Sequence, residues 1–72
     1  MDYVAGWREA TGVLTELAEA LAAAGLKGPG VRLRAGAEDD GAGVVRLELT
    51  LSTARRMTRL AEAAALHLGR AS

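Results

Sequence analysis

Few side chains in this sequence could carry out catalysis, and those few are scattered. The 72 residues contain one histidine, His67, and no cysteine. The hydroxyl-bearing residues have no motif that places a general base beside them; they are Tyr3, Thr11, Thr15, Thr50, Ser52, Thr53, Thr58 and Ser72. An active site requires titratable groups that converge in a pocket. We therefore expect no enzymatic activity, no catalytic residue and no cofactor.

The acidic and glycine-rich segments give no strong indication of a ligand site. Residues 38–40 (Glu-Asp-Asp) could hold a cation weakly, but they lack the ligand spacing of an EF-hand. Aspartate is also common in tight turns, because it forms local hydrogen bonds. Gly25, Gly28 and Gly30 follow a helix and precede a strand, whereas a phosphate-binding loop leads from a strand into a helix. The sequence has no cysteine and no CxxC or HExxH motif, so we expect no metal site.

Arginines supply the chemistry of a second candidate function, the binding of nucleic acid. Three of them fall on one face of a predicted hairpin, and three more lie in the first turns of the helix that follows. The candidate phosphate contacts are Arg32, Arg34, Arg46, Arg55, Arg56 and Arg59. A homodimer would double this basic surface. However, Glu38 and Glu48 interrupt the hairpin face, which carries no aromatic side chain to stack on bases. A formal net charge of zero does not favour long-range steering either.

The first third of the chain predicts a long amphipathic helix, from about residue 2 to residue 24. Its apolar residues recur at alternating steps of four and three, which places them on one helical face. They are Tyr3, Trp7, Ala10, Leu14, Leu17, Leu21 and Ala24. Gly25 is expected to end the helix. Gly6 and Gly12 are unfavourable within it, by about 1 kcal/mol each relative to alanine. Either the first turn frays, or Gly6 allows another backbone to approach closely.

Two segments of alternating apolar and polar residues, 31–38 and 44–51, predict an antiparallel β-hairpin. The intervening Asp-Asp-Gly-Ala-Gly is typical of a turn. The apolar residues must share a face, so paired residue numbers sum to an even value. A sum of 82 places Arg34 opposite Glu48, a favourable pair, whereas a sum of 80 places it opposite Arg46. We therefore expect the sum of 82.

The last third predicts a second helix from about residue 53 to residue 68, capped by Ser52 or Thr53 and ended by Gly69. One face carries Met57, Leu60, Ala61, Ala64 and Leu68, and the other carries Arg55, Arg59 and Glu62. Leu66 projects with the charged residues, either as an ordinary exposed leucine or as a partner contact. His67 lies at the border of the apolar face, where a histidine near a helix C-terminus usually interacts with the helix dipole.

Composition and charge set a few further limits. The alanine- and arginine-rich usage, without Ile, Asn, Gln or Phe, indicates a GC-rich genome such as a bacterial one. No apolar run approaches the roughly 20 residues of a membrane span, and the first residues lack the regions of a signal peptide. We therefore expect a cytoplasmic protein without a membrane partner. Residues 1–24 are acidic and residues 52–72 are basic, so these segments should attract each other within a chain or between chains.

Together these elements predict one α+β domain of order α-β-β-α, with two helices packed on one face of the hairpin. A domain of 72 residues has a small core, and an isolated two-stranded ribbon is marginal in water. We therefore expect a homodimer, joined into a four-stranded sheet or a helix-paired core. Its interface residues would be Tyr3, Trp7, Leu14, Leu17, Leu21 and Leu66, with Trp7 as the main anchor. In a monomer, the apolar face of the first helix would instead lie on the ribbon and the second helix.

The function expected from these features is that of a small non-enzymatic module for protein interaction, regulatory or adaptor in role. It would act as a homodimer or as a subunit of a larger complex, because oligomerisation is the remaining way to stabilise so small a domain without disulfides or metals. A dimer that binds DNA or RNA through the six arginines is the alternative.

Overall fold

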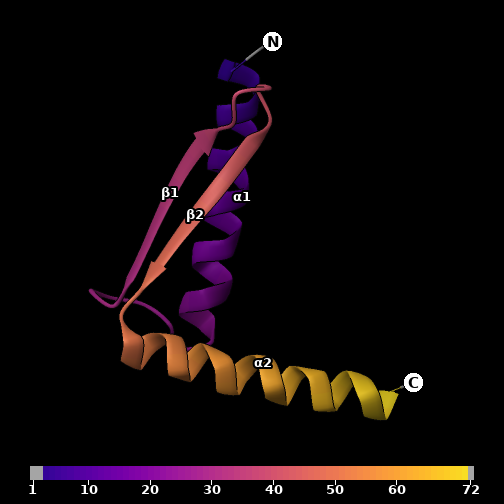
Figure 1. Cartoon of the computed structure of the whole chain (residues 1–72). Coiled ribbons are helices and arrows are strands. Elements are labelled where there is room, and N and C mark those ends of the chain that lie inside the picture. The colour runs from indigo at the N-terminus through magenta and orange to yellow at the C-terminus, as the bar shows by residue number, and fades with distance from the viewer. Residues whose placement is uncertain (1–2, 72) are drawn as a thin grey trace.

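Four elements form in the expected order. Helix α1 spans Tyr3–Ala23, strands β1 and β2 span Val31–Ala37 and Gly43–Leu49, and helix α2 spans Leu51–Ala71. The computed structural model describes residues 3–71, so residue 2, where the first helix was expected to begin, and Ser72 lie outside the described residues. The predicted α-β-β-α order and mixed α+β class are confirmed. In Figure 1, α1 lies along the hairpin, whereas α2 crosses its open end and projects away from it.

The hairpin packs one face against α1. The apolar residues of β1 that alternate with its arginines are half-buried, and Val45 and Leu49 of β2 are half-buried on the same face. From α1, Ala10 is buried and the leucines that follow it at helical spacing are half-buried. The apolar face of α1 therefore lies on the ribbon of its own chain. In the described part of the chain, no large side chain is fully buried.

Gly6 is the point at which the two backbones come closest. It is buried on α1, and a Cβ atom added there would clash with the carbonyl oxygen of Gly41 in the hairpin loop. A Cβ atom at Gly43, the first residue of β2, would clash in turn with the carbonyl oxygen of Gly6. The glycine that is unfavourable for the helix thus permits close packing of helix on hairpin, which confirms the second of the two explanations. Gly12 has open space around its Cα atom.

The first helix ends at Ala23, and Gly25 terminates it, as predicted. Gly25 has a φ angle of +85° and donates its amide to the carbonyl of Ala22, while the amide of Leu26 bonds to the carbonyl of Leu21. This pair of bonds is the Schellman motif, which satisfies carbonyls that the helix end would otherwise leave unpaired. The motif turns Leu26 back into the protein, where it is one of the most buried apolar residues.

The hairpin register differs from the expected one. Paired residue numbers sum to 80, so Arg34 lies opposite Arg46 and Leu33 lies opposite Leu47. The expected sum of 82 was wrong because the loop, rather than the charges, fixes the register. A three-residue hairpin loop requires a left-handed residue at its last position. In the observed register that residue is Gly41, with φ of +87°. The expected register allowed a loop of three or of five residues, and a three-residue loop would have ended at Ala42.

Helix α2 begins earlier and ends later than predicted. Thr50, and not Ser52 or Thr53, occupies the N-cap position: its carbonyl accepts the amide of Ala54, and its Oγ1 lies 3.4 Å from the amide nitrogen of Thr53. Thr50 Oγ1 also hydrogen-bonds to Thr53 Oγ1 at 2.8 Å. Gly69 does not end the helix, which continues to Ala71. An exposed helix interior tolerates one glycine at a cost of about 1 kcal/mol.

The position of α2 departs most from expectation. It does not pack on the hairpin face, which α1 already covers, and it makes far fewer contacts with β2 than α1 does. Only its first turns are covered: Thr53 is buried and Met57 is half-buried, whereas Leu60 and Leu68 are exposed. A two-stranded ribbon offers one helix enough width, so the second helix lies outside this contact.

Candidate interaction surfaces

The outer face of the hairpin gathers three of the predicted arginines. Arg32, Arg34 and Arg46 are all exposed there, and Arg34 lies directly opposite Arg46. Like charges at directly opposed positions destabilise a sheet, by up to about 1 kcal/mol. The side chain of Arg46 lies instead over Gly36, since a Cβ atom added there would come within 2.6 Å of its Nη1 atom. Glu48 faces Arg32 across the strands, so the face remains basic at the Arg34–Arg46 pair.

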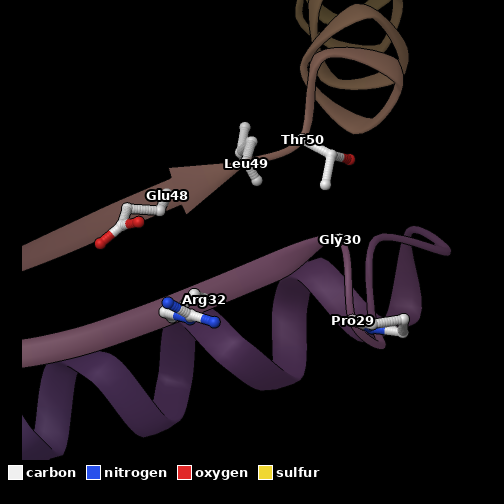
Figure 2. Close-up of a pocket in the computed structure, with 6 residues that line it drawn as sticks. All are labelled: Pro29, Gly30, Arg32, Glu48, Leu49 and Thr50. Carbon is white, nitrogen blue, oxygen red and sulfur yellow. The ribbon is translucent and has the colours of Figure 1, made fainter.

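A small cavity of about 200 Å³ opens at the end of this face (Figure 2). Arg32 and Glu48 extend from neighbouring strands beside it, and Thr50 marks the start of α2. The Thr50 hydroxyl is engaged by Thr53. The six lining residues, which are Pro29, Gly30, Arg32, Glu48, Leu49 and Thr50, include no imidazole. They supply one pair of opposite charges, from Arg32 and Glu48, and one hydroxyl, from Thr50.

The three arginines of α2 differ in their contacts. Arg56 Nη2 donates a 2.9 Å hydrogen bond to the carbonyl oxygen of Gly25, directly after α1. A cation at this position interacts favourably with the carbonyl end of a helix. Arg56 therefore joins α2 to the end of α1, while Arg55 and Arg59 are exposed on the helix surface. Arg56 was expected to contact phosphate with the other five arginines, but its guanidinium group is engaged by this backbone carbonyl.

The residues predicted to form an interface divide between two situations. Leu14, Leu17 and Leu21 are half-buried on α1, and α1 packs on both strands of the same chain. Tyr3 and Trp7 are about half-exposed at the start of α1, and the Tyr3 hydroxyl donates to the carbonyl oxygen of Asp39 in the hairpin loop. Leu66, on α2, is exposed. The structure thus does not bring these six residues together on one surface.

One uncovered apolar surface lies on α2. Helical spacing places Met57, Leu60, Ala61, Ala64 and Leu68 on one face of this helix, and all but Met57 are exposed. The sequence pattern predicted this face, but the face was expected to pack against the hairpin of the same chain. A second apolar surface is a groove of about 430 Å³ between α1 and β2, whose lining includes Ala10, Val13 and Val45.

The remaining candidate ligands have ordinary structural roles. Asp40 accepts a hydrogen bond from the amide of Ala42 at 2.9 Å through its carboxylate, which is the local turn interaction expected of aspartate. His67 is exposed on α2. Across residues 3–71, no three or more histidine, cysteine or acidic side chains are grouped so that they could hold a metal ion.

The chain matches no protein-family model, no curated protein and no solved structure. No function is therefore transferred from a relative. Neither of the helices described here is long and apolar enough to cross a membrane.

Proposed function

We propose that this chain is a non-enzymatic protein-interaction module that acts as a homodimer. The observation that carries the proposal is the lack of a core: among the described residues the buried apolar ones are Ala10 and Leu26, and no large side chain is fully buried. Burial of apolar surface is the dominant favourable term in folding. A chain that buries so little of it by itself gains stability by covering more of it with a second chain.

The dimensions of the chain support the same conclusion. Its radius of gyration is 14.5 Å, whereas a compact domain of this length has one of about 11 Å. Its accessible surface is 5473 Å², whereas a compact monomer of this mass exposes roughly 4,200 Å². The difference exceeds the surface of about 800 Å² that each partner buries in a standard protein interface. An elongated shape with this much surplus surface is suited to association.

The proposal is tested by solution mass, measured by light scattering coupled to size exclusion over a dilution series. We expect a mass near twice the 7.4 kDa of one chain, maintained on dilution to low micromolar concentration. Circular dichroism at each concentration should show that the protein remains folded. A folded species with the mass of one chain at every concentration would contradict the proposal.

One observation favours a second candidate function, the binding of nucleic acid by the outer hairpin face. The direct opposition of Arg34 and Arg46 is unfavourable by itself and would become favourable beside a phosphate, which both guanidinium groups could contact. The exposed Arg32 lies on the same face. A dimer would present two such faces.

This second function is tested by binding to a DNA duplex and to a single-stranded RNA at several salt concentrations. The double variant Arg34→Ala, Arg46→Ala should bind more weakly. Its plot of log K against log salt for duplex DNA should also be shallower, with a slope smaller in magnitude by about 2. The matched control changes Arg8→Ala and Lys27→Ala, two exposed cations outside this face. Equal losses in the two variants would indicate nonspecific attraction, and no binding by the unaltered protein at low salt would rule this function out.

A further inference from the structure

The uncovered face of α2 raises the question of what covers it in the dimer. Beyond Met57, every described side chain of this helix is exposed. An amphipathic helix derives most of its stability from packing of its apolar face. In a helix of 21 residues that contacts the rest of its chain only at one end, that packing must come from elsewhere.

The apolar face of α2 is complementary to itself in the antiparallel direction. Met57, Ala61, Ala64 and Leu68 are spaced four, three and four residues apart, as in the contact face of paired helices. When two copies run antiparallel about a two-fold axis between Ala61 and Ala64, Ala61 meets Ala64 of the other copy. In the same arrangement Met57 meets Leu68. Small residues lie where the two helices cross, and longer side chains lie where they diverge.

The charges on α2 favour the antiparallel direction over the parallel one. The first half of the helix carries Arg55, Arg56 and Arg59 and no acid, whereas the second half carries Glu62 and Arg70, whose formal charges cancel. A parallel pair would place the two sets of arginines side by side. An antiparallel pair avoids this repulsion, because it places each set of arginines beside the half of the partner helix that carries no net charge, and it also sets the two helix dipoles in opposite directions.

From these observations we propose that α2 of a second copy covers α2, antiparallel and centred between Ala61 and Ala64. The contact is isologous, since each helix presents the same face to the other, and it closes as a dimer. This inference rests on the proposed homodimer and names the surface that forms it. Tyr3, Trp7 and the outer arginines lie outside the contact and stay exposed in the dimer.

Two leucines of α2 provide a matched test of this surface. Leu68 and Leu66 have nearly equal exposures, 68% and 66%, but lie on the apolar and charged faces respectively. Leu68→Glu places two charges in the contact and should raise the dimer dissociation constant at least tenfold, about the value of one buried leucine side chain. Leu66→Glu should leave it unchanged within about twofold. Light scattering over a dilution series gives both constants, and circular dichroism confirms that each variant is folded.

Disulfide trapping tests the direction of the helices, and the chain is suited to it because it contains no cysteine. The double variant Met57→Cys, Leu68→Cys should form a covalent dimer under mild oxidation, because each cysteine meets the other kind in the partner helix. Leu68→Cys alone should stay uncrosslinked, because in this arrangement the two copies of residue 68 lie about 16 Å apart along the axis.

The possible outcomes distinguish a wrong interface from the absence of a homodimer. A dimer that is weakened by Leu66→Glu and not by Leu68→Glu would overturn the assignment of the surface while leaving the homodimer intact. Efficient crosslinking of Leu68→Cys alone would show a parallel pair and overturn the direction. A folded monomer in the unaltered protein would remove both the homodimer and its interface.

Discussion

At the scale of single residues, packing requires one glycine of α1 and leaves another without a structural reason. Gly12 has open space around it, whereas an added Cβ at Gly6 would meet backbone atoms of the hairpin loop. Backbone cannot move aside as the end of a flexible side chain can. Helix propensity alone would favour alanine at both positions by about 1 kcal/mol.

We therefore expect Gly6→Ala to lower the free energy of unfolding by roughly 1–3 kcal/mol, the usual cost of overpacking. Gly12→Ala is the matched control and should raise it by up to about 1 kcal/mol. Urea unfolding followed by circular dichroism measures both. If Gly6→Ala proved as stabilising as Gly12→Ala, the close approach of helix and hairpin would be wrong.

Thr50 is the N-cap of α2 and directly precedes its first residue. The sequence had suggested Ser52 or Thr53 as the cap. Thr50→Ala should lower the free energy of unfolding by about 1 kcal/mol, because the hydroxyl that faces the Thr53 amide is lost. Ser52→Ala is the control, since Ser52 is exposed and its hydroxyl lies 3.4 Å from that of Thr50; it should change the stability by less than about 0.5 kcal/mol. A larger loss in Ser52→Ala would restore Ser52 as the cap.

At the scale of elements, both helices, both strands and the end of α1 before Gly25 could be predicted from periodicity and glycine placement. The register could not, because the prediction compared cross-strand charges worth a few tenths of a kcal/mol and ignored the backbone of the loop. Gly41 satisfies the left-handed position of the loop, and Ala42 would be strained there. The requirement of the loop outweighed the repulsion of two exposed arginines.

Charge reversal on the hairpin distinguishes the two registers. Arg34→Glu should raise the free energy of unfolding by roughly 0.5 kcal/mol, because it places a carboxylate opposite Arg46. Arg32→Glu should lower it by a similar amount, because it creates two opposed glutamates with Glu48. Both sites are exposed and on the same strand, so each serves as the control for the other. In the other register Arg34 would face Glu48, and Arg34→Glu would destabilise the hairpin.

At the scale of the whole molecule, the sequence could predict which residues form each candidate surface, but not which other element covers it. Helical spacing identified the apolar faces of both helices, yet only the arrangement in space shows that α1 uses its face within the chain while α2 does not. Arg56 illustrates the same limit. Its hydrogen bond to Gly25 joins positions 31 residues apart, a contact that no local pattern in the sequence indicates.

The proposed dimer also makes the stability of the whole molecule depend on its concentration. If folding and association are coupled, each tenfold dilution lowers the free energy of unfolding of the dimer by about 1.4 kcal/mol, because dilution favours the separated, unfolded chains. For two chains of 72 residues this corresponds to a fall in melting temperature of about 5 °C per tenfold dilution. Thermal scans from 1 to 100 μM measure the slope. Leu66→Glu should preserve the slope and Leu68→Glu should lower the melting temperature at every concentration. A melting temperature of the unaltered chain that does not change with concentration would mean that its small core is sufficient without a partner.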